Sequence, residues 1–284
     1  LGAISGTVTE GGSTATFTVV LDVEPSSNVV ISVTSGDTGE ATVSAANLTF
    51  TNGNWNSAQT VTVTGVDDNI IDGNINTTIT MAVVDASSDD NFDDVANQTV
   101  TATTVDDDTA GFTLSTTTAT VTEAGGTATF TVVLDAQPDS DVVISVTSGD
   151  TGEATVSAAN LTFTNGNWNS AQTVTVTGVD DNLVDGSVNT TITMAVVDAS
   201  SDDNFDDVAN QTVTATTTDN DTAGFTLSKT TATVSEGADT DTYTVVLNAQ
   251  PDSDVVITVT SADTGEVTVS AAELTFTNGN WNSA

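Results

Sequence analysis

A tandem repeat constrains this chain more than any other feature of its sequence. Residues 34–69 occur again, without a single change, as residues 147–182, and a third copy begins at Thr260. The tryptophans of the three copies are 113 residues apart, at Trp55, Trp168 and Trp281. A unit of this length can bury a core of its own without disulfides or a structural metal. The chain is therefore an array of similar domains.

The length of the chain predicts two complete domains and part of a third. We expect repeats at residues 1–110, 111–223 and 224–284. Leu1 aligns with Leu114 and Ala284 with Ala171, so the last repeat holds only its first half. We interpret the chain as a window on a longer array, in which the neighbouring repeats are the first partners of each unit.

The second repeat shows the pattern of short β-strands. Apolar and polar residues alternate in segments about ten residues apart, separated by turns rich in Gly, Asn, Asp and Pro, and no segment has a helical period. We expect seven strands in the segments 118–123, 127–135, 141–147, 154–163, 172–178, 189–197 and 211–216. The segment 154–163 can also form two short strands. This pattern predicts an all-β protein of antiparallel β-sandwiches.

An odd number of strands determines how the repeats follow one another. If the strands alternate in direction, the chain enters each domain at one end, the proximal pole, and leaves it at the other, the distal pole. We therefore expect the domains to stack end to end as a rod. The same alternation places Glu123 and the acidic segments 150–153, 180–186 and 219–221 at the distal pole. It places the acidic segments 135–141 and 198–207 at the proximal pole, so carboxylates face one another at each junction.

The charge of the chain excludes several classes of function. Asp and Glu number 40 against a single basic residue, Lys229, which gives a net charge of -39. A chain of this charge repels nucleic acids and anionic membranes, and it has no apolar run of membrane length. His and Cys are both absent, which removes the usual ligands of zinc, copper, haem and iron–sulfur clusters. Hard cations with oxygen ligands remain.

Calcium suits the acidic loops of the distal pole better than magnesium does. It takes six to eight oxygen ligands in flexible geometry, whereas magnesium prefers a tight octahedron and keeps its waters. The acids of one distal pole exceed the needs of one ion, so we expect more than one Ca²⁺ at each junction. In the second repeat the candidate ligands are Glu123, Asp150, Asp180, Asp181, Asp185, Asp219 and Asp221. The alternative is that these acids are solvated loop residues, or the acidic surface of a halophilic protein.

Several segments together resemble the Calx-beta domain. They are ValThrGlu at 121–123, the GlyGly turn and strand at 125–134, LeuThrPhe at 161–163, the strand ending in GlyValAspAspAsn at 178–182, and the closing acidic triplet at 219–221. The chain is similar in particular to the Calx-beta-like and cadherin-like repeats of giant bacterial surface adhesins. The resemblance implies an immunoglobulin-like sandwich that binds calcium at its distal pole. In the first repeat the implied ligands are Glu10, Asp37, Asp67, Asp68, Asp72, Asp106, Asp107 and Asp108.

The chain departs from this family in the loop that precedes the sixth strand. Two or three Glu residues usually follow there, whereas this chain has Asp72-Gly73-Asn74 and Asp185-Gly186-Ser187. The site therefore has fewer strong ligands than a typical member. Catalysis is not expected, because every pair of acids recurs at the repeat spacing and no unique pair exists.

We expect extracellular, calcium-stabilised extender repeats of a bacterial adhesin or stalk. One alternative is a subunit of a self-assembling extracellular fibre or matrix, in which rods associate laterally or end to end. Another is a carbohydrate-binding accessory module that uses Trp55 and Trp168 as stacking platforms, although an aromatic residue in such a turn more often caps the core. In each case the chain acts without nucleic acid partners and without membrane insertion.

Overall fold

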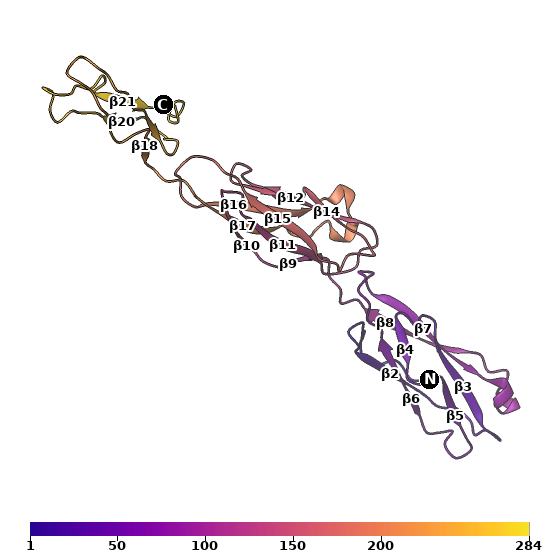
Figure 1. Ribbon diagram of the computed structural model, residues 1–284. Helices are drawn as coiled ribbons and strands as arrows, with labels where there is room; N and C mark the ends of the chain where they lie inside the picture. The colour runs from indigo at the N-terminus through magenta and orange to yellow at the C-terminus, as the bar shows by residue number, and fades with distance from the viewer. Residues whose placement is uncertain (284) are drawn as a thin grey trace.

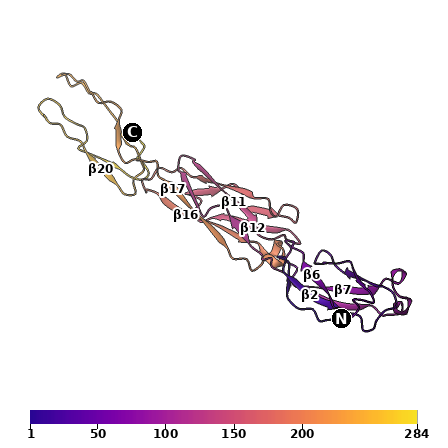
Figure 2. The same cartoon turned by 90° about the horizontal axis from the view of Figure 1, so that it is seen from below.

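The computed structural model describes residues 1–283 as three β-domains that follow one another in an extended row (Figure 1). A view turned by 90° shows the same row, so the elongated arrangement does not depend on the viewpoint (Figure 2). The prediction of tandem β-sandwiches is confirmed. The boundaries between the repeats stay a prediction.

The first domain is a sandwich of a five-stranded and a three-stranded sheet. The strand order is β1-β8-β7-β3-β5 in one sheet and β2-β6-β4 in the other. The strands are β1 (Val8–Thr9), β2 (Thr14–Val19), β3 (Val29–Ser35), β4 (Ala41–Val43), β5 (Asn47–Phe50), β6 (Gln59–Gly65), β7 (Ile75–Val83) and β8 (Gln98–Val105). Two short 3-10 helices, η1 (Asp85–Ser87) and η2 (Asp90–Phe92), lie between β7 and β8.

The second domain repeats this topology and adds one edge strand. Its sheets have the orders β10-β17-β16-β12-β14 and β13-β15-β11-β9. The strands are β9 (Phe112–Leu114), β10 (Thr118–Thr122), β11 (Thr127–Leu134), β12 (Val142–Ser148), β13 (Ala154–Val156), β14 (Asn160–Phe163), β15 (Gln172–Gly178), β16 (Val188–Val196) and β17 (Gln211–Thr218). The helices η3 (Asp198–Ser200) and η4 (Asp203–Phe205) occupy the places of η1 and η2.

The third domain holds only two strand pairs. These are β18 (Phe225–Leu227) with β19 (Val245–Leu247), and β20 (Val255–Thr258) with β21 (Glu273–Phe276). Its core contains three buried residues, Val245, Leu247 and Phe276. Phe225 is 53% exposed, whereas its counterpart Phe112 is buried in the second domain.

Alternating Val and Thr residues explain the strands and the core together. In β6, Val61 and Val63 are buried, and the alternating Thr60, Thr62 and Thr64 lie on the outer face. Both residue types are β-branched and favour extended backbone, so one face packs into the core while the other stays polar. The core of the first domain is completed by large side chains such as Phe17 and Phe50.

In the first two domains, a strand near the start of the repeat runs parallel to the last strand. β1 pairs with β8 in parallel, with Val8 opposite Thr104, and β10 pairs with β17 in the same way. The other pairs between named strands are antiparallel. A chain whose first and last strands share a direction leaves the domain at the pole opposite to its point of arrival, which is the polarity expected from an odd strand count.

The structure has more strands than the seven expected for one repeat. The segment 154–163 forms two short strands, β13 and β14, and these belong to opposite sheets. The N-terminal segment of the second repeat is also divided, because β9 pairs with β11 whereas β10 pairs with β17. In each case the two halves of one segment pair with different sheets, so the segment provides an edge strand to both.

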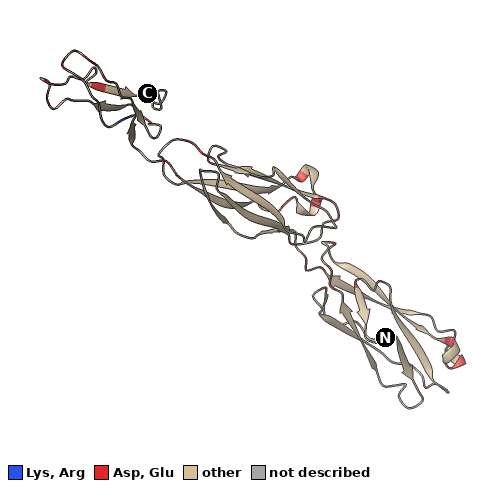
Figure 3. Ribbon diagram, in the orientation of Figure 1, with Lys and Arg blue, Asp and Glu red and all other residues tan. Residues whose placement is uncertain are grey.

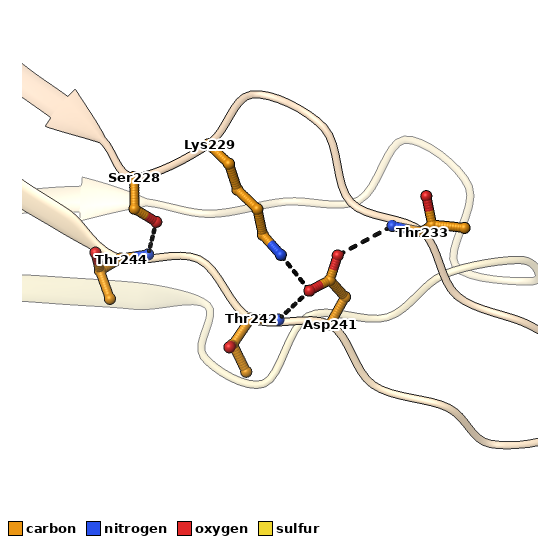
Figure 4. Close-up of polar contacts among 6 residues, drawn as sticks. All are labelled: Ser228, Lys229, Thr233, Asp241, Thr242 and Thr244. Carbon is orange, nitrogen blue, oxygen red and sulfur yellow. Dashed lines mark hydrogen bonds and ion pairs between the residues drawn. The ribbon is translucent and has the colours of Figure 1, made fainter.

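The single basic residue forms an ion pair in the third domain. Lys229 Nζ donates to Asp241 Oδ1, and the same carboxylate accepts hydrogen bonds from the backbone N–H groups of Thr233 and Thr242 (Figure 4). The hydrogen bond from Lys229 is the main reason that the pKa of Asp241 is lowered. Among residues 1–283, this is the only pair between a basic side chain and a carboxylate.

Candidate metal centre

Four chain segments converge at the distal pole of the first domain. They are the end of β1, the turn between β3 and β4, the loop between β6 and β7, and the segment that follows β8. The parallel pairing of β1 with β8 continues to the hydrogen bond from Glu10 N to Val105 O, at 3.2 Å, and so places Glu10 beside the acidic triplet 106–108. Figure 3 shows that the acidic residues lie mainly in loops, linkers and the short 3-10 helices, with few along the strands.

The carboxylates of these segments form two clusters that share Glu10. One cluster contains Glu10, Asp68 and Asp108, and the other contains Glu10, Glu40 and Asp72, each with one oxygen per residue within 4.8 Å of the others. Like charges at this separation repel one another strongly away from bulk water. The arrangement therefore needs protons or a cation among the carboxylates.

The second domain has the matching clusters at its own distal pole. Glu123, Asp181 and Asp221 form one group, and Glu153, Asp181 and Asp185 form the other, within the same 4.8 Å limit. Here Asp181 is the shared residue. The membership of the second cluster differs, but the two clusters of each domain together use the same five positions of the repeat, which indicates that they belong to the repeat rather than to a single loop.

Some of these acids are buried and lack hydrogen-bond partners. Glu10 is 1% exposed, and within residues 1–283 its Oε2 atom has no partner. The same holds for one carboxylate oxygen each of Glu40 and Asp108, and in the second domain for Glu153 and Asp221. A buried polar atom left without a partner costs about 1–3 kcal/mol, more when it is charged. Several such oxygens directed into one cluster fit a hard cation such as Ca²⁺.

Burial and mutual repulsion shift the protonation of the clusters. Burial is the main cause that raises the pKa of Glu10 from 4.5 to about 7, and the charges of Asp106, Asp68 and Asp72 add to it. Burial likewise raises the pKa values of Glu40 and the cluster aspartates Asp72 and Asp108. In the second domain it raises those of Glu123, Glu153 and Asp221. Near neutral pH Glu10 is therefore partly protonated unless a cation takes the place of the proton, and the pKa values of the other cluster acids are shifted in the same direction.

A glycine at the end of β6 lets the clusters assemble. A Cβ atom on Gly65 would lie 2.1 Å from the backbone oxygen of Thr9, and one on Gly178 would lie 2.2 Å from that of Thr122. Only glycine allows the ends of β1 and β6 to approach so closely. This approach brings Glu10 next to the loop that carries Asp68 and Asp72.

Other acids of the distal pole hold the loops in shape. Asp106 accepts hydrogen bonds from the backbone N–H groups of Gly73 and Asp108, both at 2.8 Å. Asp37 Oδ1 accepts from Gly39 N at 2.9 Å. Asp68 has both roles, because it belongs to a cluster while its Oδ1 atom accepts from Ile70 N at 2.7 Å.

The structure brings together about half of the candidate ligands expected from the sequence. The clusters include Glu10, Asp68, Asp72, Asp108, Glu123, Asp181, Asp185 and Asp221. The remaining candidates lie in the same segments but outside the clusters; they are Asp37, Asp67, Asp106, Asp107, Asp150, Asp180 and Asp219. Whether any of these residues ligates an ion stays a prediction.

Sequence reasoning missed Glu40 and Glu153 as cluster members. Each lies directly before a short strand and is carried inward because its backbone oxygen accepts a hydrogen bond from a buried threonine. Thr104 Oγ1 donates to Glu40 O at 3.2 Å, and Thr217 Oγ1 donates to Glu153 O at 3.1 Å. The available signal was that each glutamate ends the same acidic turn that contains Asp37 or Asp150.

The cluster loop of the first domain also forms the junction with the second. Ile70 pairs with Gln137 in a parallel β-bridge, and Gln137 N donates to Asn69 O at 2.7 Å. Ile71 packs against the core of the second domain, and its backbone oxygen accepts a hydrogen bond from Asn204 Nδ2 at 3.2 Å. The junction residues 69–71 thus lie between the cluster acids Asp68 and Asp72.

The second junction repeats the backbone contacts. Leu183 bridges to Gln250, and Gln250 N donates to Asn182 O at 2.7 Å. Val184, the counterpart of Ile71, is 47% exposed. The third repeat ends at the position of Ala171, before the counterparts of Asn204 and the core residue Phe205.

The carboxylates of the two poles face each other less directly than the sequence suggested. Asp139 of the second domain is near enough to Asp72 to contribute to its raised pKa. Asp202, in contrast, is bound within its own pole, where it accepts hydrogen bonds from Ser140 N at 2.8 Å and Asn204 N at 3.0 Å. The repulsion is therefore concentrated inside the distal clusters.

The turn tryptophans are bound into their domains. Trp168 packs against the core of the second domain, and its backbone oxygen accepts a hydrogen bond from Leu134 N at 3.2 Å. Trp55 O accepts from Leu21 N at the same distance.

In residues 1–283 no helix is long and apolar enough to cross a membrane.

The fold and the clusters define tandem β-sandwich domains with a cluster of carboxylates at the distal pole of each of the first two domains. The sequence matches the Calx-beta domain three times, over residues 5–109, 105–221 and 218–281. The chain therefore belongs to the Calx-beta domain family. A comparison with curated protein sequences finds no match.

Solved structures with a similar fold include Calx domains and a surface-layer protein. The chain is 15% identical to "calcium binding domain CBD12 of CALX1.1", covering 66% of this chain and 76% of that chain, with a TM-score of 0.33. It is 22% identical to domains 4 and 5 of the S-layer protein SbsC, covering 50% of this chain and 65% of that chain, with a TM-score of 0.31. At these identities and TM-scores the similarities carry no argument about function.

Proposed function

We propose that this chain is a spacer rod whose joints are stiffened by Ca²⁺, and that it serves as part of the stalk of an extracellular bacterial adhesin. One observation carries the proposal. The loop between β6 and β7 provides Asp68 and Asp72 to the clusters and, between them, Ile70 and Ile71 to the junction. Anything that orders the carboxylates also orders the joint.

The residues of the clusters are suited to hold calcium. Their ligand atoms are all oxygens, and several of these are buried without a hydrogen-bond partner among the described residues. When bound, Ca²⁺ supplies positive charge and coordination to oxygens that otherwise repel one another. A cation that binds only the folded state stabilises it by about 2.7 kcal/mol when its free concentration is a hundred times the dissociation constant.

The charge of the chain supports the extracellular setting. Extracellular modules bind calcium with dissociation constants of about 0.1–1 mM, which suits a structural ion in a calcium-rich medium. The net charge of -39 is offset where such an ion is abundant.

Small-angle X-ray scattering on the full chain tests the proposal. The scattering profile is measured in CaCl₂, in MgCl₂ and in excess chelator, all at one ionic strength. We expect a long, sharply defined maximum dimension with Ca²⁺ and a broader distribution with chelator. The double variant Asp68→Asn/Asp181→Asn should resemble the chelated protein even in Ca²⁺.

A matched control separates ligation from net charge. The double variant Asp94→Asn/Asp207→Asn removes the same charge from exposed residues of the proximal pole. It should keep the response to Ca²⁺. A wild-type profile that ignores Ca²⁺ but tightens with monovalent salt would show a halophilic surface and would reject the proposal.

A further inference from the structure

The two complete centres differ in one acidic position. The triplet after β8 is Asp106-Asp107-Asp108, whereas the triplet after β17 is Asp219-Asn220-Asp221. The other acids of the two distal poles correspond one to one along the repeat. The repeats therefore provide an internal comparison of one position, which has a carboxylate in the first centre and an amide in the second.

The amide of Asn220 provides hydrogens to two acids of the second centre. Its Nδ2 atom donates to Asp180 Oδ1 at 2.9 Å, and its backbone N–H donates to Glu123 Oε2 at 3.2 Å. Asn220 thus neutralises part of the repulsion from within the protein. Glu123 is as buried as Glu10, at 1% exposed, and each accepts a hydrogen bond from the backbone of the middle residue of its triplet, so the side-chain donor of Asn220 is what distinguishes the second centre.

The first centre has no side-chain donor at this position, and its surroundings accommodate a carboxylate. The side chain of Asp107 has no N–H group to donate, unlike that of Asn220, and Glu10 Oε2 has no partner within residues 1–283. Asp107 Oδ2 lies against Gly11, where an added Cβ atom would be 2.9 Å away. In the second repeat the residue corresponding to Gly11 is Ala124. The glycine and the carboxylate thus occur together, as do the alanine and the amide.

We propose that the residue at position 107 or 220 sets the calcium affinity of its centre. This inference rests on the proposed binding of Ca²⁺ to the clusters. A unit charge several ångström from a divalent ion in a largely hydrated setting changes the affinity on the order of tenfold. The first centre therefore binds Ca²⁺ on the order of tenfold more tightly than the second. It is also less stable than the second when Ca²⁺ is absent.

The difference in calcium affinity between the two centres has a consequence for the rod. As the concentration of Ca²⁺ falls, the second centre releases its ions first, while the hydrogen bonds of Asn220 retain part of its order. The first centre holds its ions longer and loses more order when they leave. The two joints then loosen at different calcium concentrations.

Calcium titration of the full chain with reciprocal substitutions tests this inference. Binding of CaCl₂ is followed by calorimetry in wild type, Asp107→Asn, Asn220→Asp and the double exchange. Wild type should show two classes of sites that differ on the order of tenfold in affinity. Asp107→Asn should merge them at the weaker affinity and Asn220→Asp at the tighter one, while the double exchange should restore two classes at unchanged net charge.

Thermal unfolding in chelator measures the melting temperature of the calcium-free protein, which does not depend on calcium affinity. Without Ca²⁺, Asp107→Asn should raise the melting temperature and Asn220→Asp should lower it, opposite to their effects on affinity. The inference is overturned if both variants keep the wild-type separation of the two classes. It is also overturned if one substitution moves affinity and calcium-free stability in the same direction. Wild type that binds no Ca²⁺ would reject the proposed function itself, and the melting temperatures in chelator would still report on the Asn220 hydrogen bonds.

Discussion

Replacing Glu10 with Gln should stabilise the calcium-free first domain and abolish its stabilisation by calcium. Burial raises the pKa of Glu10 from 4.5 to about 7. A pKa difference of one unit between the folded and unfolded states corresponds to about 1.4 kcal/mol, so the buried charge costs about 3 kcal/mol at pH 8. Gln has nearly the same shape and carries no charge, and its amide can donate to Asp68 or Asp108.

The sign of the pH dependence follows from the raised pKa. Below pH 4.5 Glu10 is protonated in both states and contributes no penalty. As the pH rises toward 7, the unfolded state releases its proton first, so the free energy of unfolding falls. Glu10→Gln should therefore leave calcium-free stability almost unchanged at pH 4.5 and raise it by about 3 kcal/mol at pH 8.

Urea unfolding monitored by tryptophan fluorescence measures this effect. Trp168→Phe and Trp281→Phe in the background leave Trp55 as the reporter of the first domain. Asp22→Asn, which removes an exposed acid of the proximal pole, is the charge-matched control and should change little at either pH. The reasoning fails if Glu10→Gln destabilises the calcium-free protein at pH 8, or if its effect is equal at the two pH values.

Three further predictions follow from the site. Gly65→Ala should prevent the approach of β1 to β6, lower the free energy of unfolding by about 1–3 kcal/mol in urea, and abolish calcium binding in calorimetry. Gly53→Ala is the control, because its added Cβ atom would lie 3.8 Å from the nearest atom. Equal behaviour of the two variants would contradict the packing argument. Ile71→Ala should weaken the first joint by about 1 kcal/mol and broaden its scattering profile, whereas Val184→Ala should have little effect because Val184 is 47% exposed. Calcium affinity should fall as the pH is lowered from about 8 to 6, with proton release on binding, because ligands must be deprotonated and the pKa of Glu10 lies near 7; an affinity independent of pH in calorimetry would refute this.

The sequence predicts the strands well because their chemistry is local. Alternating Val and Thr determine both the extended backbone and the buried face, as in β6 and β15. It predicts the polarity of the rod because a segment expected as one strand keeps its direction where the structure divides it between two sheets, as with β13 and β14. The division of the N-terminal segment between two sheets is not local, since β9 and β10 differ in partner rather than in composition.

The same distinction applies to the candidate centre. The segments that meet at the distal pole follow from strand order, so the sequence brings Glu10, Asp68 and Asp108 to one place. Which acids turn inward depends on hydrogen bonds between distant segments, such as that from Thr104 to Glu40, and these have no signature in the sequence. The junction role of Ile71 is likewise hidden, because an aliphatic residue in an acidic loop can pack inside its own domain as well as against the next.

The distance across the first joint tests the central claim most directly. The chain has no cysteine, so Thr49→Cys and Thr162→Cys place spin labels at equivalent exposed positions of β5 and β14 without background labelling. Pulsed electron–electron double resonance then gives the distribution of the distance between the two spin labels. The account predicts a narrow distribution in Ca²⁺ that broadens in chelator, and a broad one in both conditions for Asp68→Asn. A wild-type distribution of the same width with and without Ca²⁺ would contradict it.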